Sequence, residues 1–357
     1  MQVTTTSDRP SEALAQVSKR VSQSVFDGSR LRVVLLVDVY DGAQQQFLEA
    51  YEQLCNQVAS VPGHVSDQLC QSIENPSQWL ITSEWESAPP FLTWVNSEEH
   101  VRMVEPLHSC VRDTRSLRFH IVRETGGAAD RQEPGQRRLQ AHPRIGDGVI
   151  RHALTFTVRP GTEEKVAKIL SEYASPEARV DDTTRLCRTS LFMHGNRVVR
   201  AIEVRGDLLA ALRHVSRQPE VRAVEAAINP YLEQDRDLDD QESARMFFTR
   251  AALPAVHHVS AEGAPEGKRV ALFYPARPDR GMRLAELLAQ ADSAAAEDPA
   301  SPVLRSTVFQ RDDVVVRLVD VRDEQGAAPE VPAGLRELLD GEAARMDLIT
   351  DRRSPEV

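Results

Sequence analysis

The stretch RVVLLVDVYDG at residues 32–42 decides the fold, because an apolar strand pattern that ends in a turn signal returns twice along the chain. RHALTFTVRPG at residues 151–161 and RVALFYPARPDRG at residues 269–281 repeat it, each about 120 residues after the last. In every copy, apolar residues at helical spacing follow the strand and predict an amphipathic helix with one buried face. The chain is therefore expected to hold three copies of one structural unit.

Each copy continues with two further strands, a second helix and, in the first two copies, a closing strand. The expected strand pairs are 65–73 with 78–86, 184–193 with 197–205, and 303–310 with 313–321. The second helices are expected near Pro89, Asp207 and Val331, and the closing strands at 115–122 and 244–251. Copy three shows no fourth-strand pattern. The order β-α-β-β-α-β is that of the ferredoxin-like, or split βαβ, unit.

The predicted fold class is thus α+β, with tandem ferredoxin-like repeats that pair into dimeric-α/β-barrel-type units. Helices cover only one face of such a sheet, so its other face needs a second unit as cover, and a barrel interior formed in this way is a natural pocket for a flat apolar ligand. Three copies leave one unit over, which predicts a homodimer. The expected segments are a flexible N-terminal segment at 1–29, a first unit at 30–122, a linker at 123–150, a second unit at 151–259 and a degenerate third repeat at 268–357.

Composition and motifs exclude several classes of function. The net charge of −11 disfavours nucleic-acid binding, and no apolar run is long enough for a membrane helix. The Ser- and Thr-rich start lacks the pattern of a secretory signal, so a cytoplasmic protein is expected. The four cysteines are scattered, and neither metal-ligand spacing nor a phosphate-binding glycine motif is present. We therefore expect no metal and no organic cofactor.

Two stretches carry a family likeness. WLITSEWESAPPFLTWVNSEEH at residues 79–100 resembles antibiotic-biosynthesis monooxygenase domains. RHALTFTVRPGTEEKVAKIL at 151–170 and RQPEVRAVEAAINPYLEQ at 217–234 are similar to aromatic polyketide cyclase domains of the tetracenomycin type. In this order they resemble the SchA/CurD-like proteins of bacterial spore-pigment and pentangular polyphenol pathways, over roughly residues 30–259.

The resemblance implies a monooxygenase, an oxidoreductase of antibiotic and polyketide biosynthesis, that converts an anthrone-like polycyclic phenol to a quinone. Molecular oxygen would be the co-substrate, with neither flavin nor metal. The implied partners are an aromatic polyketide intermediate and polyketide cyclases. Such chemistry needs a base, a group that stabilises an anion, and a pocket that excludes water.

Four residues are the candidates for catalysis. Arg118 and His120 alternate with apolar residues on the closing strand of copy one and so share one face. If the apolar face packs on the helices, this pair looks into the barrel, where it would serve as anion-stabilising cation and general base. Trp85 matches the strand-end Trp of the family and would form a wall of the site or donate its indole N–H to the substrate. His100 is a substitute base. A solvent position for Arg118 and His120, and plain core packing for Trp85, are the competing interpretations.

The candidates for substrate binding are Trp94, His108, Thr155, Arg188 and Arg200. Trp94 occupies a helix position where many relatives carry His. The haem-degrading relatives have a haem-ligating His ten residues after the corresponding Trp, a position that Val104 occupies here, so the sequence does not support haem ligation. Surface charge on an amphipathic sheet is the competing interpretation for the two arginines.

Two other functions remain open at this point. A polyketide cyclase would use the barrel to position a reactive poly-β-ketone without consuming oxygen. A non-catalytic protein would stabilise a complex of polyketide synthase and cyclases, which a degenerate third repeat and an acidic surface would suit. Oxygen consumption separates the monooxygenase from both alternatives.

Overall fold

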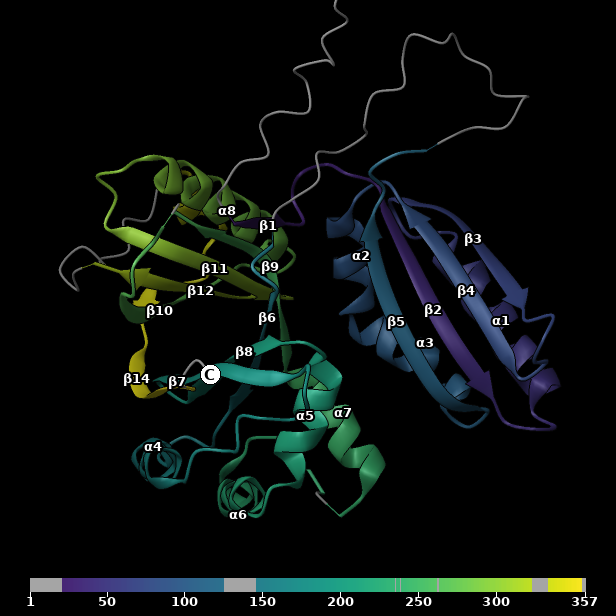
Figure 1. Ribbon diagram of the computed structural model, residues 1–357, viewed down its shortest axis with the longest axis horizontal. Coiled ribbons are helices and arrows are strands. Elements are labelled where there is room, and N and C mark those ends of the chain that lie inside the picture. The colour runs from purple at the N-terminus through teal and green to yellow at the C-terminus, as the bar shows by residue number, and fades with distance from the viewer. Residues whose placement is uncertain are drawn as a thin grey trace, which may run out of the picture.

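The computed structural model describes residues 21–124, 146–234, 236–237, 239–261, 263–322 and 333–354. Most of the predicted N-terminal segment 1–29 and of the predicted linker 123–150 lies outside these ranges. Within them the chain forms two bodies, a four-stranded sheet with its helices and a ten-stranded sheet with the others (Figure 1). In the described residues, no helix is long and apolar enough to cross a membrane.

The first body is the predicted βαββαβ unit. Its elements are β2 (Leu31–Val39), α1 (Gln44–Val58), β3 (His64–Gln71), β4 (Gln78–Trp85), α2 (Ala88–Val95), α3 (Glu98–His108) and β5 (Val111–His120). The strands are antiparallel in the order β3-β4-β2-β5. The second helix is broken into α2 and α3 because Ser97 adopts extended backbone angles and caps a new helix.

The sheet of this body has one covered and one open face. Leu31, Val33 and Val37 of β2 are buried beneath the helices. On the opposite face Leu36 is 44% exposed and Phe119 51% exposed. No described part of the chain covers this open face, so the expected cover by another sheet is not found within the described chain, and a second chain as its cover stays a prediction.

The second body contains the second and third units. The second unit consists of β6 (Val149–Thr157), α4 (Glu163–Glu172), β7 (Arg185–His194), β8 (Arg197–Arg205), α5 (Leu208–Arg217), α6 (Pro219–Ile228), the 3-10 turn η3 (Asn229–Tyr231), α7 (Gln241–Ala251) and β9 (Ala252–Ser260). The third consists of β10 (Lys268–Pro275), α8 (Gly281–Glu297), β11 (Val303–Arg311), β12 (Val314–Val321), the 3-10 helix η5 (Ala333–Leu338), β13 (Ala344–Arg345) and β14 (Asp347–Arg353). The short strand β1 (Ser22–Ser24), within the predicted N-terminal segment, pairs with β9.

The two units exchange their last strands, and this exchange makes the barrel. β9 pairs first with β6 of its own unit and then with β11 of the third unit. Likewise β13 pairs with β10 of its own unit, and β14, one residue further on, pairs with β7 of the second unit. Between them, the Met346 N–H donates to the Ala271 carbonyl, 2.9 Å away. The result is one antiparallel sheet that nearly closes on itself, so the expected pairing of ferredoxin-like units into a barrel is confirmed.

Two details of the sequence interpretation are wrong. Residues 244–251, expected to be a closing strand, lie in helix α7, where Phe247 and Ala251, one turn apart, face the same core cluster. The closing strand is β9, which follows directly. The third unit does have a fourth strand, formed by β13 and β14. In place of the α-helix expected near Val331, the described residues form only the 3-10 helix η5.

The barrel interior is filled rather than hollow in its middle. Phe192 and Phe309 are almost fully buried there. Further along β7 from Phe192, Arg188 belongs to a layer of buried charges. In that layer Asp320 accepts hydrogen bonds from both Arg188 and Arg269. Paired buried charges and aromatic side chains therefore occupy the space in which the sequence suggests a pocket for a flat apolar ligand.

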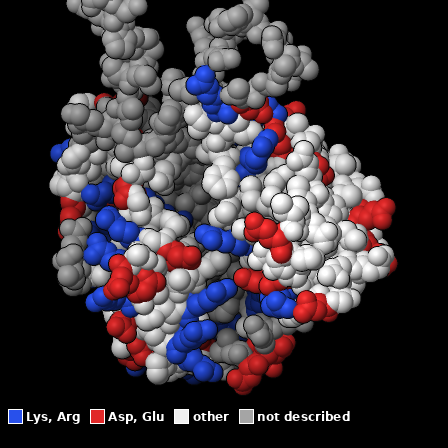
Figure 2. Space-filling view, turned by 45° about the vertical axis from the view of Figure 1, so that its right-hand side comes forward, with Lys and Arg blue, Asp and Glu red and all other residues white. Residues whose placement is uncertain are grey.

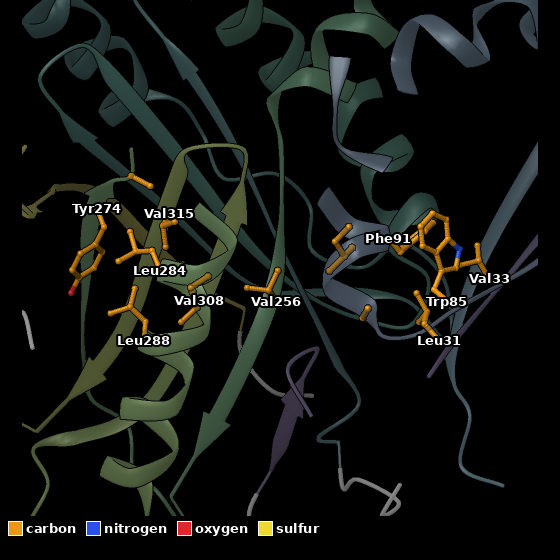
Figure 3. Close-up of a cluster of buried hydrophobic side chains, with 14 of the residues drawn as sticks. Leu31, Val33, Trp85, Phe91, Val256, Tyr274, Leu284, Leu288, Val308 and Val315 are labelled. Atoms are coloured by element: carbon orange, nitrogen blue, oxygen red, sulfur yellow. The ribbon is translucent and has the colours of Figure 1, made fainter. Parts of the chain in front are cut away.

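One connected cluster of buried apolar side chains extends from beneath the helices of the first unit to beneath α8 of the third unit. Figure 3 shows Trp85 and Phe91 of the first unit on one side, Leu284 and Leu288 of α8 on the other, and Val256 of β9 between them. Val256 also accepts a backbone hydrogen bond from Val25 at 3.0 Å. The chain that enters the first unit is thereby attached to the barrel.

Candidate functional site

A stack of aromatic rings lies under the helices of the first unit, where β4 ends. The proline-led first turn of α2 starts the helix, and Phe91 and Trp94 follow three residues apart on one of its faces. The Trp85 ring lies 5.5 Å from that of Trp94 and 5.4 Å from that of Phe91, between centroids. Gly63 permits this approach of α2, because a side-chain carbon at Gly63 would lie 2.7 Å from Pro90.

His100 joins this stack through a helix cap. The Ser97 hydroxyl accepts a hydrogen bond from the His100 N–H at 3.1 Å, which fixes the first turn of α3. The imidazole then meets the Trp94 ring edge-on at 4.3 Å. Burial, and secondarily the Arg118 charge, lower the pKa of His100 to about 4. The ring is therefore neutral at pH 7.

Arg118 lies on the helix-covered face of β5 and not, as expected, on the face that would look into a barrel, because alternation along a strand does not show which face the helices cover. The strand register pairs Val33 with Arg118, and the guanidinium lies 5.2 Å from the centre of the Phe91 ring. Although part of the side chain stays accessible, desolvation lowers the pKa of Arg118. In the described residues, no carboxylate lies within salt-bridge distance of it. Arg118 is thus a cation held by an aromatic face alone.

Several polar atoms of this cluster lack protein partners. Trp94 Nε1 and His100 Nδ1 are buried, and no described group forms a hydrogen bond with either. The Trp85 indole, by contrast, donates to the Ser83 hydroxyl at 3.0 Å. Buried polar atoms without partners are costly unless a ligand or water satisfies them. Trp94 and His100, rather than Trp85, therefore have hydrogen-bonding capacity left for a ligand.

A cavity of about 580 Å³ borders this cluster at the junction of the two bodies. Residues of β1, β6, β9 and the end of β5 line it, and its polar side chains include His120, Arg151 and His258. His120 lies two residues along β5 from Arg118, on the same face, so the two side chains are neighbours. The volume is within the usual range for sites that bind small organic molecules.

Burial disfavours the charged forms of His120 and His258, which line this cavity, and of His152, which follows the lining residue Arg151 on β6. Burial lowers the pKa of His120, and burial together with Arg118 lowers that of His152 to about 4. His120 Nδ1 lies 3.8 Å from a carboxylate oxygen of Asp27. A carboxylate at this distance favours the imidazolium that forms when the ring takes up a proton. The cavity thus offers imidazole proton acceptors and the cation of Arg151 in its lining, with Arg118 next to His120 on β5.

The other sequence-predicted residues lie apart from this cluster. His108 ends α3, about 12 Å of helix rise from His100. Arg188 is buried in the barrel, where Asp351 and Asp320 accept its hydrogen bonds. Arg200 faces the helices and forms an ion pair with Glu225 at 2.7 Å. Thr155 lines a second, smaller cavity between the bodies.

His152 is a site residue that the sequence analysis did not identify. It lies on the outer face of β6, where the charge of Arg118 from the first unit adds to burial in lowering its pKa. The sequence does show a histidine among the apolar residues of a helix-facing row. Its place in the site follows only from the contact between the two bodies. Among the described residues, no group of three or more His, Cys, Asp or Glu side chains is placed to hold a metal ion.

Two family models match the chain, one in each body. A family model described as antibiotic biosynthesis monooxygenase matches residues 30–106, and one described as SchA/CurD like domain matches residues 149–261. The chain is therefore of the class in which a monooxygenase-like ferredoxin-type unit precedes a SchA/CurD-like domain.

Similarity over nearly the whole length defines the family. The chain is 61% identical to the 42.8 kDa protein in the whiE locus of Streptomyces coelicolor, covering 96% of this chain and 88% of that protein. It is 59% identical to the polyketide synthase CurD of Streptomyces cyaneus, covering 94% and 98%. The chain belongs to the SchA/CurD-like family of polyketide biosynthesis proteins.

Solved structures resemble one part of the chain. SnoaB, a cofactor-independent oxygenase from Streptomyces nogalater, is 16% identical, covers 30% of this chain and 99% of its own, and has a TM-score of 0.25. A putative antibiotic biosynthesis monooxygenase from Nitrosomonas europaea is 14% identical, covers 28% and 98%, and has a TM-score of 0.26. At these scores neither likeness bears on the activity.

Proposed function

We propose that the protein is a cofactor-independent monooxygenase that oxidises an anthrone-like polycyclic phenol to a quinone in the biosynthesis of pentangular polyphenols or spore pigments. The observation that carries the proposal is the combination on β5 of Arg118, a cation without a carboxylate partner among the described residues, and His120, a neutral imidazole that lines the 580 Å³ cavity. These are the two groups that deprotonation of a phenol or activated methylene requires.

The reaction needs no electron donor besides the substrate. The methylene carbon loses a proton, and the resulting carbanion passes one electron to molecular oxygen. The carbon radical and superoxide then combine to a peroxide. Loss of the second C–H proton with cleavage of the O–O bond leaves a carbonyl group and releases water. One CH₂ group and one O₂ thus give one C=O and one H₂O.

Each residue of the cluster has a role in this scheme. His120 accepts the first proton, and Asp27 beside it stabilises the imidazolium. Arg118 stabilises the phenolate oxygen across the face of Phe91. Trp94 Nε1 donates to a substrate oxygen, and His100 supplies a second neutral imidazole next to it. His100 is the substitute base if His120 serves only to orient the substrate.

The proposed assembly is a homodimer that uses the open sheet face of the first unit. In the second and third units the corresponding inner faces cover each other within the barrel. The first unit presents the equivalent face with Leu36 and Phe119 exposed. A second copy of the chain is the occupant that repeats the pairing already present in the barrel. Polyketide cyclases that supply or receive the polycyclic intermediate are the further partners.

Oxygen uptake tests the proposal. Purified protein is mixed with 1,8-dihydroxyanthrone, and oxygen consumption and the quinone absorbance are followed together, with the protein-free oxidation subtracted. We expect one O₂ consumed per quinone formed, and a loss of at least tenfold in the His120→Phe variant. The matched control is His194→Phe, at the exposed end of β7, which should retain the activity. Equal rates with and without protein would refute the proposal.

A further inference from the structure

Arg197 is a cation without an ion pair, placed on the smaller cavity between the two bodies. It is the first residue of β8, and its Nη1 donates to the Thr155 hydroxyl at 3.2 Å. The guanidinium carbon lies 5.4 Å from the centre of the Phe273 ring. In the described chain, no carboxylate lies within salt-bridge distance of Arg197, and its Nε and Nη2 are neither hydrogen-bonded nor buried.

The neighbouring charges do not replace the missing partner. Arg250 binds both carboxylate oxygens of Glu98, at 3.0 and 3.1 Å. Arg311 donates to the backbone carbonyls of Asn96, Thr249 and Ala252. Its nearest carboxylate is that of Asp312, at 3.6 Å. The cavity lining therefore contains three arginines and two carboxylates, and Glu233, outside this lining, acts on Arg197 through its charge without coming within salt-bridge distance.

Thr155 holds this guanidinium in place. The Thr155 hydroxyl donates to the Val198 carbonyl at 3.1 Å and accepts from Arg197, so it fixes one edge of the guanidinium fork. The other edge remains for two parallel hydrogen bonds of the kind that carboxylates and phosphates accept. Thr155, which the sequence nominates as a substrate-binding residue, is on this geometry a positioning residue.

The shape of the cavity limits the ligand. Its volume is about 210 Å³, and Phe156, Phe247 and Val314 supply apolar walls. A cavity of about 150 Å³ accommodates benzene, so one ring with an anionic substituent fits here. The cavity lies where Glu98 of the first unit meets Arg250 of the barrel, and in Figure 2 Lys and Arg side chains gather along the boundary between the two bodies.

We infer that this cavity is a binding site for an oxyanion, carboxylate or phosphate, carried on a single ring or the end of a larger molecule, with the Arg197 guanidinium as its partner. Leaving a partly desolvated cation unpaired costs free energy, and an anion that displaces water from Nε and Nη2 recovers it. The site is separate from the cluster around Arg118 and does not depend on the oxygenase proposal. It would hold a carboxylated intermediate or a phosphate-bearing carrier at the junction of the two bodies.

Calorimetric titration of the full-length protein under argon tests this inference, because no turnover is involved. The probes are benzoate and phenyl phosphate, which distinguish the two anion types, with benzamide as the neutral control. We expect benzoate or phenyl phosphate to bind at one site per chain and benzamide to bind at least tenfold more weakly. Failure of both anions to bind, or equal binding of benzamide, would overturn the inference whatever the oxygen assay gives.

Variants locate the site. Arg197→Met should weaken anion binding by about 10- to 150-fold, the range for loss of hydrogen bonds to a charged group, and Arg197→Lys by less. Thr155→Val should weaken it a fewfold, because the fork is no longer held. Arg205→Met, at the exposed opposite end of β8, is the matched control and should bind like the wild type. If Arg197→Met fails to fold, unchanged affinity in the Arg197→Lys and Thr155→Val variants refutes the site.

Discussion

Replacing Arg118 with Met should separate catalysis from stability in the first unit. Met keeps an unbranched apolar stem and removes the charged guanidinium together with its hydrogen-bond donors. In the folded protein the guanidinium contacts the Phe91 ring at 5.2 Å and has no described carboxylate partner. A cation–π contact at an accessible position contributes about 0.5–1 kcal/mol, so unfolding should become easier by no more than about 1 kcal/mol.

The effect on turnover should be much larger. A hydrogen bond to a charged group contributes roughly 1.5–3 kcal/mol, which corresponds to about a 10- to 150-fold loss in kcat/KM if Arg118 binds the developing phenolate. The pKa of His100 should also rise from about 4, because Arg118 contributes to its depression. It should remain below 6.5, since burial is the larger cause and is unchanged.

Three measurements on one preparation check this reasoning. Urea denaturation gives the free energy of unfolding, quinone formation gives kcat/KM, and an NMR titration of the histidine rings gives the pKa of His100. Arg102→Met, on the exposed side of α3, is the control for the loss of one positive charge. A variant of Arg118 with wild-type kcat/KM would refute its role, and an unchanged His100 pKa would refute the proximity of the two groups.

Three further outcomes are expected. Asp320→Asn removes the carboxylate shared by buried arginines in the barrel and should lower the free energy of unfolding in urea by about 3–5 kcal/mol; a loss below 1 kcal/mol would contradict the ion-pair layer. The unfolded chain binds protons at His100 and His152 more readily than the folded chain, so the free energy of unfolding should fall as pH drops from 6.5 towards 4. The loss should reach up to about 1.4 kcal/mol per pH unit for each ring. A free energy of unfolding that does not depend on pH in this window would show that these rings are not buried in their neutral form. Leu36→Glu should convert the proposed dimer to a monomer in light scattering while Ile73→Glu, fully exposed in a turn, should not; a monomeric wild type would end the dimer proposal.

Local patterns in the sequence were sufficient for most of the first unit. The alternation on β5 correctly groups Arg118 with His120, because side chains two residues apart on a strand share a face. The alternation gives no sign of which face the helices cover, and that decides whether the pair meets Trp94 and His100 or solvent. Ser97 caps α3 and so breaks the second helix, which places His100. A capping serine of this kind can be recognised in the sequence.

The barrel was harder to derive because its closure depends on strands that leave their own units. β14 reads DLITDRR, with few apolar residues, since its inner face meets a charged layer in which Asp351 binds Arg188. A polar strand of this kind has no period-two signal to detect. The sequence of helix α7 was interpreted as a strand because Phe247 and Phe248 are adjacent aromatic residues, a residue type common in strands. His152 and Arg197 could not be identified as site residues from the sequence, because only the contact between the two bodies places them at a site.

Comparing turnover in air and under argon tests whether the protein oxidises its substrate with molecular oxygen and without a bound cofactor. The protein is treated with a chelator, freed of flavin and nicotinamide by gel filtration, and incubated with 1,8-dihydroxyanthrone in both atmospheres. We expect quinone formation above the protein-free rate in air and none under argon. Equal product in both atmospheres would contradict it and favour the cyclase, and activity that returns only on addition of a metal or flavin would contradict the mechanism.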